Sequence, residues 1–213
     1  MNNNALPRDE KERKKRLGTL IAGAAIVCLF LSSIILAVHP IASAILDDSP
    51  FVVLVRHGDA PGRGEPDGFD LSDCRTQRNL SDKGRDDARK IGQMVRASGI
   101  NVTKVLTSRW CRARETAELM KLRSIENAAT FDDLSFNKQH AEELLDGEHE
   151  LIASWHGPGA LLVVTHGSNI KALTGIDLEQ GTMVVVSAGQ GRLVGQRFST
   201  FPAIAAQNCT GCF

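Results

Sequence analysis

Two histidines stand in matching local contexts that indicate a shared site. His57 follows the apolar, β-branched run 51–55, and His166 follows a similar run at 160–164. Continuous apolar runs of this length are typical of strands that are covered on both faces in a parallel sheet. Polar residues at the carboxyl ends of such strands lie where open α/β sheets place their sites. The pattern therefore predicts that the two imidazoles meet at one edge of a sheet.

The residues beside these histidines indicate what the site would bind. Arg56 directly precedes His57, and Arg112 stands at the predicted start of a helix that follows another strand. Guanidinium groups stay charged at any working pH, and their geometry matches phosphate oxygens. Gly58 and Gly167 follow the two histidines and would let the backbone approach a ligand closely. Together these residues describe an anion pocket with an imidazole nucleophile.

The segments between these positions alternate between strand and helix patterns. Ser81 is a suitable N-cap for a helix that runs up to Gly99 with apolar residues at helical spacing. Further elements are expected as a strand at 102–106, a helix that includes 112–120, an acidic amphipathic helix at 139–155, and a closing hairpin of strands 183–186 and 192–198 around 189–191. Alternating strands and helices predict an α/β fold, a three-layer sandwich with a mostly parallel central sheet flanked by helices.

The N-terminal part predicts a membrane anchor. Residues 17–38 carry no charge, and a helix of that length spans a hydrocarbon core of about 30 Å. Basic residues gather just before this stretch, and such residues stay on the cytoplasmic side. The expected segments are a basic cytoplasmic N-terminus 1–16, a transmembrane helix 17–38, a linker 39–50, an extracytoplasmic domain 51–198 and a C-terminal tail 199–213. A cleaved signal peptide is the alternative, because Ala42-Ser43-Ala44 has the small residues of a cleavage site.

The overall charge gives no support for nucleic-acid binding. The chain of 213 residues has 25 basic and 25 acidic side chains, which cancel to a net charge of zero. The hydrophobic share of 42% is that of an ordinary folded protein and excludes a disordered chain. We therefore expect no nucleic-acid partner.

Three motifs in order carry a family resemblance. Leu54-Val55-Arg56-His57-Gly58, the run from Ser108 to Ala117 (SRWCRARETA), and Val164-Thr165-His166-Gly167 resemble the histidine phosphatase superfamily, also called phosphoglycerate mutase-like. The resemblance covers residues 51–198. It implies a phosphoric monoester hydrolase that needs no metal or cofactor and forms a phosphohistidine at His57. Arg56, Arg112 and His166 would hold the transferred phosphoryl group.

The resemblance leaves the general acid open. Three residues are candidates for the acid that protonates the leaving oxygen: Asp59, Asp132 and Asp133. The choice among them stays open, because none of the three matches the family pattern unambiguously. Substrate contacts are expected from the backbone glycines of the two histidine motifs, Gly58 and Gly167, and from Arg78 and Ser108. A zinc site at the two histidines is the competing reading, which the neighbouring arginines disfavour because they repel a divalent cation.

The predicted location and substrate follow from the anchor and the resemblance. We expect a bacterial protein of the inner (cytoplasmic) membrane with its catalytic domain in the periplasm. Its substrate would be a phosphorylated small molecule or an envelope glycan, such as an envelope sugar phosphate. Two alternatives are a phosphoprotein phosphatase, acting on phosphohistidine or phosphoserine/threonine, and a catalytically idle binding module tethered to the membrane.

Two pairs of cysteines are placed where disulfides could form. Cys74 and Cys111 lie in two loops that should converge near the pocket, and an oxidising compartment would let them form a disulfide. Cys209 and Cys212 form a Cys-x-x-Cys pair near the C-terminal end, for which a tail disulfide is the simplest expectation.

Overall fold

The computed structural model describes residues 50–187 and 196–198, and these form an α/β domain built on one sheet. The strands lie in the order β3-β2-β4-β1-β5-β6. The first four along the chain run parallel to one another, β5 is antiparallel to β1, and β6 is antiparallel to β5. Their bounds are β1 (Phe51–Arg56), β2 (Val102–Thr107), β3 (Ile125–Asn127), β4 (Ala160–Thr165), β5 (Met183–Ser187) and β6 (Gln196–Phe198).

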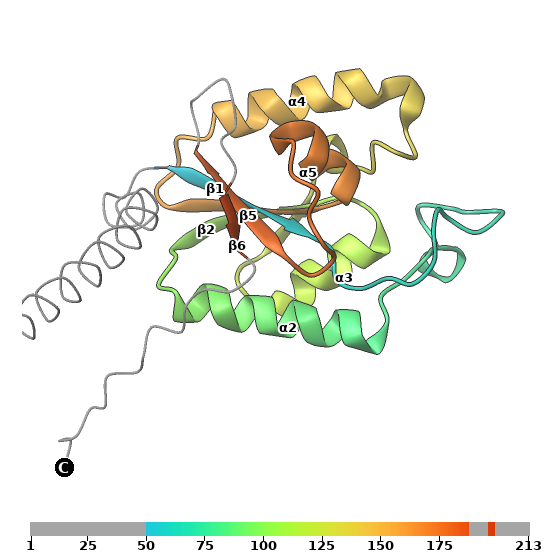
Figure 1. Ribbon diagram of the computed structural model, residues 1–213, viewed down its shortest axis with the longest axis horizontal. Coiled ribbons are helices and arrows are strands. Elements are labelled where there is room, and N and C mark those ends of the chain that lie inside the picture. The colour runs from blue at the N-terminus through green and yellow to red at the C-terminus, as the bar shows by residue number, and fades with distance from the viewer. Residues whose placement is uncertain (1–49, 188–195, 199–213) are drawn as a thin grey trace, which may run out of the picture. The chain divides into compact units, whose positions relative to one another are not determined.

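Helices cover both faces of this sheet. In Figure 1, α2 and α3 lie against one face, and α4 and α5 lie against the other. The helices are α2 (Asp82–Ala97), α3 (Cys111–Met120), α4 (Ala141–Ala153) and α5 (Gly167–Thr174), with short 3-10 helices η1 (Cys74–Thr76), η2 (Ala129–Phe131) and η3 (Lys138–His140). The predicted three-layer sandwich with a mostly parallel sheet is confirmed for the described residues.

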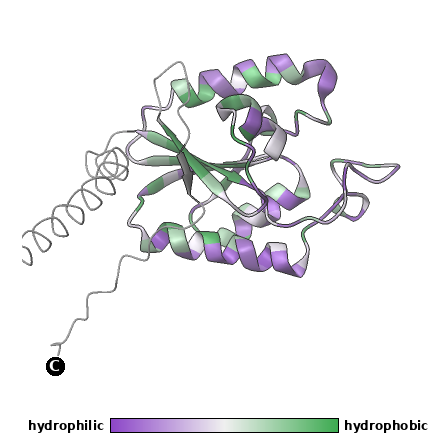
Figure 2. Cartoon of the chain, in the orientation of Figure 1, coloured by the Kyte–Doolittle hydropathy of each residue, from purple (hydrophilic) through white to green (hydrophobic). Residues whose placement is uncertain are grey.

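Burial on both faces explains the composition of the central strands. Residues 52–55 of β1 and all of β4 are fully buried. Because side chains alternate across a strand, Val52 and Leu54 pack into the core beneath α4 and α5, and Val53 and Val55 face α2 and α3. Figure 2 shows the sheet as the apolar centre, with hydrophilic residues on the outer sides of the helices.

The start of α2 is fixed close to the end of β1. Ser81 is the N-cap, and its Oγ accepts a hydrogen bond from the backbone N–H of Gly84 at 3.0 Å. A Cβ atom at Gly58 would lie 2.4 Å from the backbone oxygen of Gly84, so a larger residue does not fit there unless the backbone shifts. This contact anchors the loop that carries the first histidine motif.

The structure differs from the sequence expectations at two helices. Helix α5 was not predicted, although Ile170 and Leu173 are buried at helical spacing and Gly175 ends the helix in the left-handed conformation with φ of 72°. Helix α4 begins at Ala141 rather than 139, because η3 precedes it. Strand β6 is described only at 196–198, and the predicted hairpin turn 189–191 lies outside the described residues.

The predicted membrane anchor also lies outside the described residues. Segments 1–16 and 17–38, most of the linker 39–50 and the tail 199–213 with Cys209 and Cys212 belong to this part of the chain. Among the helices that the structure does describe, none combines the length and the apolar character needed to cross a bilayer.

Candidate active site

The two motif histidines meet at the carboxyl edge of the sheet. His57 follows β1 and His166 follows β4, which is the neighbouring strand, and their ring centroids are 5.4 Å apart. Both side chains are buried at the base of a cavity of about 310 Å³. The cavity is lined by Arg56, His57, Arg78, Asp133, Ser135, His166, Gly167, Ser168, Lys171 and Asp177.

His57 is held as a neutral imidazole with its lone pair on one defined nitrogen. Its Nδ1 lies 2.8 Å from the carbonyl oxygen of Gly58, so Nδ1 carries the hydrogen and donates it. Burial, reinforced by His166 and Arg112, lowers the pKa of His57 well below its ordinary value, although the Gly58 carbonyl opposes this. The lone pair therefore lies on Nε2. That is the arrangement that nucleophilic attack requires.

His166 is also neutral. Burial lowers its pKa to about 3, with Asp133 opposing and Arg112 reinforcing the shift. Its Nδ1 accepts from Arg112 Nη2 at 3.3 Å, and its Nε2 lies 2.8 Å from Ser108 Oγ. Because Nδ1 accepts from Arg112, the neutral ring carries its hydrogen on Nε2 and donates it to Ser108 Oγ.

Arg112 connects the members of the site. The side chain is 1% exposed, and its Nε donates to His57 Nε2 at 3.2 Å. Its Nη2 donates to Asp133 Oδ2 at 3.1 Å as well as to His166. The N-terminal turn of α3 sets its position, because Arg112 is the second residue of that helix. Arg112 does not itself line the cavity. A guanidinium held between both histidines can bind the oxygens of a phosphoryl group that reaches the two rings and spread their charge.

Glu65 is a site residue that the sequence pattern did not identify. It comes from the loop between β1 and η1, and its side chain is 4% exposed. Its Oε1 accepts from Arg112 Nη1 at 2.5 Å, and its Oε2 accepts from the backbone N–H of Arg78 at 3.0 Å. This carboxylate partly neutralises Arg112 and fixes its orientation.

Arg56 contributes a second guanidinium to the cavity. Its Nη1 donates to the carbonyl oxygen of Leu178 at 2.5 Å, and within the described residues its buried Nε has no hydrogen-bond partner. A Cβ atom at Gly167 would lie 2.9 Å from Arg56 Cζ. Gly167 therefore makes room for this guanidinium, in addition to lining the cavity.

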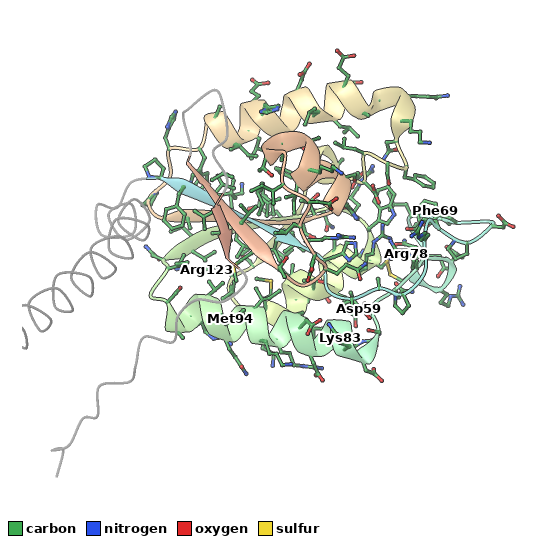
Figure 3. All side chains as sticks on the ribbon, viewed as in Figure 1. Asp59, Phe69, Arg78, Lys83, Met94 and Arg123 are labelled. Atoms are coloured by element: carbon green, nitrogen blue, oxygen red, sulfur yellow. A yellow bond between two sulfur atoms is a disulfide. The ribbon has the colours of Figure 1, made fainter. Side chains whose placement is uncertain are left out.

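Arg78 lies at the rim of the cavity and also organises the loop before it. Its Nη1 donates to the carbonyl oxygen of Ala60 at 2.5 Å, and its Nε donates to that of Gly64 at 2.9 Å. Figure 3 shows Arg78 on the loop segment that precedes α2. A cation in this place can contact an anionic ligand in the cavity while it holds the loop.

Two residues expected to contact substrate support the histidines instead. Gly58 does not line the cavity; its N–H donates to Thr116 Oγ1 at 3.0 Å, and its carbonyl holds His57. Ser108 is fully buried, does not line the cavity, and bonds His166 and Asp132. Both positions therefore act on the site through the imidazoles rather than through direct contact with the cavity.

The three candidate acids occupy different environments, and only one lines the cavity. Asp59 turns away: its Oδ2 accepts from Ser81 Oγ at 2.5 Å, next to the start of α2 (Figure 3). Asp132 is buried and accepts from Arg109 Nε at 2.7 Å and from the backbone N–H of Arg109 at 2.9 Å. Asp133 faces the cavity beside Arg112. Of the three carboxylates, Asp133 is the one placed at the cavity, whereas Asp59 and Asp132 are held in contacts with Ser81 and Arg109.

Asp133 is ionised in the free protein. Burial by itself would raise its pKa, but His166, the hydrogen bonds from Ser135 and Ser168, and Arg112 together lower it to about 2. Its Oδ1 accepts from the backbone N–H and the hydroxyl of Ser135 at 3.0 and 2.6 Å, and from Ser168 Oγ at 2.8 Å. These bonds hold Oδ2 toward His166 Nδ1, 3.6 Å away.

A buried pair behind the cavity supports this carboxylate. Asn169 Nδ2 donates to the backbone oxygen of Asp132 at 2.9 Å and to Glu148 Oε1 at 2.5 Å. Burial raises the pKa of Glu148 to about 8, against a smaller opposing effect of Asn169. Glu148 therefore carries a proton at neutral pH. Its place on the inner side of α4 gave no sequence signal beyond an acidic helix face.

A disulfide closes the wall next to Arg112. Cys74 and Cys111 are bonded, with Cα atoms 5.7 Å apart, as predicted. The backbone N–H of Cys111 donates to Gln77 Oε1 at 2.9 Å. The bridge ties η1 to the first residue of α3, directly before Arg112. In the part of the chain that the structure describes, no three His, Cys, Asp or Glu side chains are grouped as metal ligands would be.

Comparison with known proteins gives this geometry a family context. A family model of the histidine phosphatase superfamily, branch 1, matches residues 52–143. That match covers less than half of the chain. A stretch of 69 residues is 33% identical to the mitochondrial serine/threonine-protein phosphatase Pgam5 of Drosophila grimshawi, covering 32% of this chain. It spans only 21% of the length of that curated relative.

Solved structures of other proteins agree with the fold of the described domain. YhfR of Bacillus stearothermophilus aligns with a TM-score of 0.55 at 17% identity, covering 73% of this chain and 99% of that one. The product of open reading frame Rv3214 of Mycobacterium tuberculosis aligns with a TM-score of 0.50 at 16% identity, covering 68% and 95%. At these identities the likeness is one of fold alone.

Proposed function

We propose that the protein hydrolyses a phosphomonoester through a phosphohistidine at His57. The observation that carries the proposal is the placement of His57 Nε2 at the base of the cavity, 3.2 Å from Arg112 Nε and facing His166. A neutral nucleophile with guanidinium groups around it suits phosphoryl transfer, in which the protein mainly positions the group and stabilises its charge. The convergence of all four motif residues also argues against an idle binding module.

The first chemical step transfers the phosphoryl group to the protein. His57 Nε2 forms a bond to phosphorus while the bond from phosphorus to the ester oxygen breaks, and the electron pair leaves with that oxygen. The ring becomes positively charged, and the Gly58 carbonyl accepting from Nδ1–H stabilises it. In the second step water attacks phosphorus, the phosphorus to nitrogen bond breaks, and inorganic phosphate forms.

Asp133 is the proposed acid of the first step and base of the second. Its pKa of about 2 means that it holds no proton at neutral pH in the free protein. A phosphomonoester monoanion brings a proton of its own, because the second pKa of such a phosphate is about 6. We infer that this proton passes through Asp133 to the leaving oxygen. The value of kcat/KM should then fall as the pH rises above about 6.

The site of action is proposed to be outside the cytoplasm, on an envelope sugar phosphate or a related small molecule. The disulfide between Cys74 and Cys111 supports an oxidising compartment. The uncharged stretch 17–38 with basic residues before it supports a membrane anchor with that orientation. The orientation is checked by a reporter fused after the last residue, which should behave as extracytoplasmic.

A phosphoprotein substrate is the second candidate. It is favoured by the similarity of 69 residues to Pgam5, which is named as a serine/threonine-protein phosphatase. The cavity chemistry is the same for both candidates, because each presents a phosphomonoester or phosphoramidate to the same imidazole. Side-by-side turnover of sugar phosphates and phosphopeptides distinguishes them.

The proposal is tested by turnover of the purified full chain with a panel of phosphomonoesters in the presence of a strong chelator. Release of inorganic phosphate should continue with the chelator present and should disappear in the His57→Ala variant. The matched control is His140→Ala, because His140 is exposed and lies outside the cavity. Loss of activity on chelation, or equal activity in His57→Ala, would contradict the mechanism.

A further inference from the structure

Three aromatic side chains from three separate loops meet beside the phosphoryl cavity. Phe69 belongs to the loop after β1, Trp110 directly precedes α3, and Phe136 lies between η2 and η3. Phe69 stacks on Trp110 with ring centroids 5.6 Å apart, and Phe136 meets Phe69 edge to face at 4.8 Å and Trp110 at 5.7 Å. We call Phe69, Trp110 and Phe136 the aromatic cluster. Figure 3 shows Phe69 on the same loop segment as Arg78.

The aromatic cluster is joined to the catalytic groups at both ends. The Trp110 ring meets the His166 ring edge to face, with centroids 5.6 Å apart. Phe136 directly follows Ser135, which lines the cavity and bonds Asp133. The cluster therefore lies next to the side of the cavity that His166 and Ser135 form, just beyond the residues that line it.

One ring of the cluster is left for contact with a ligand. Trp110 is buried. Phe136 is 50% exposed, and among the described residues it is the large apolar residue that is classed as exposed. A single exposed phenylalanine on a surface needs no explanation. Here, however, the exposed ring is fixed by two further rings that arrive from other loops.

We propose that Phe136, supported by Phe69 and Trp110, binds the alcohol part of the substrate, and that this part carries a ring with an apolar face. The inference rests on the proposed phosphatase function and names the class of its substrate. The arginines and histidines hold the phosphoryl end, and the ring of the alcohol lies against Phe136 by offset stacking or through its C–H groups. An aromatic ring and a sugar ring share this chemistry.

Binding of phosphonates that cannot be hydrolysed tests the inference without turnover. Calorimetric titration of the full chain compares methylphosphonate, benzylphosphonate and the phosphonate isostere of glucose 6-phosphate. At least one ring compound should bind the wild type about fivefold or more tightly than methylphosphonate, since an aromatic pair contributes that order of affinity. The compound that gains identifies the ring as an aryl group or a sugar.

Variants at Phe136 decide whether the aromatic cluster is responsible. Phe136→Ala should remove the advantage of the ring compound and leave the binding of methylphosphonate unchanged, whereas Phe136→Tyr should keep both. Gln139→Ala, an exposed neutral position three residues away, is the control and should behave as the wild type. Equal affinity for all three compounds in the wild type, a ring advantage that survives in Phe136→Ala, or an equal loss for all compounds would overturn the inference.

These outcomes separate this inference from the proposed function. If the protein binds ring phosphonates preferentially but releases no phosphate from esters, the phosphatase mechanism fails and the ring site stands. If it hydrolyses esters without any ring preference in binding, the ring site fails and the mechanism stands.

Discussion

The replacement of Glu148 by glutamine should make the stability of the protein much less sensitive to pH. Glu148 is fully buried, its Oε1 accepts from Asn169, and its Oε2 has no partner within the described residues. Burial raises its pKa from 4.5 to about 8. Between these two values the folded state holds a proton that the unfolded state has released. The contribution of Glu148 to the free energy of unfolding is therefore fully present below pH 4.5 and falls as the pH rises toward 8.

The size of the effect follows from proton linkage. One bound proton changes the free energy of unfolding by about 1.4 kcal/mol per pH unit. Between pH 5.5 and pH 7.5, Glu148 should therefore lower the free energy of unfolding by about 2.7 kcal/mol. Glutamine has the shape of the protonated acid and cannot ionise. Over this pH interval the free energy of unfolding of the wild type should fall by that amount relative to that of Glu148→Gln.

Urea unfolding of both proteins at a series of pH values measures this difference. Glu142→Gln is the matched control, because the same substitution is then made at an exposed position of the same helix. The control should follow the pH dependence of the wild type. If the curves of the wild type and Glu148→Gln run parallel from pH 5.5 to pH 7.5, Glu148 is not protonated in the folded state and the reasoning is refuted.

Three further predictions concern the cavity wall. Asp133→Asn should lower kcat about 10²-fold to 10⁴-fold for alkyl phosphates and much less for p-nitrophenyl phosphate, because the leaving group of the latter needs little acid assistance. Steady-state kinetics with both substrates check this. Asp59→Asn is the control, and its kcat should stay near that of the wild type with both. Glu65→Gln should tighten the binding of inorganic phosphate about threefold to tenfold, because it removes a negative charge from Arg112 and keeps an acceptor there; calorimetry would count weaker binding against this interpretation. Replacing Cys74 and Cys111 by serine should lower the free energy of unfolding by about 4 kcal/mol for a loop closed over a sequence separation of 37 residues, and an unchanged urea midpoint would contradict it.

The sequence predicted the parts of the site that depend on topology. His57 and His166 end two apolar strands, and parallel strands that are neighbours in a sheet must bring such residues together. The pairing of Cys74 with Cys111 follows from the same convergence of loops. These predictions needed only the direction and order of the strands.

Side-chain orientation lay beyond the sequence. Asp132 and Asp133 are adjacent, yet one bonds Arg109 behind the site and the other lines the cavity. Which of two neighbouring carboxylates turns inward depends on the backbone path after η2, and no periodicity encodes that path. Asp59 is directed away by a hydrogen bond from Ser81, 22 residues further along the chain.

Long-range contacts from irregular loops were equally hidden. Glu65 lies in a Gly- and Pro-rich loop, and only the folded path of that loop brings its carboxylate to Arg112. The expected direct role of Gly58 in ligand contact was replaced by close packing against Gly84. Helix α5 was overlooked because it is only 8 residues long and begins at the glycine of the second histidine motif.

Phosphorylation of His57 is tested most directly by rapid-quench labelling of the full chain with ³²P-labelled phenyl phosphate, followed by peptide mapping under alkaline conditions that preserve phosphohistidine. The label should appear on His57 before inorganic phosphate is released, and it should be absent from His166. It should also be lost in acid and absent from His57→Ala. A label on His166, or full phosphate release by His57→Ala, would contradict the mechanism.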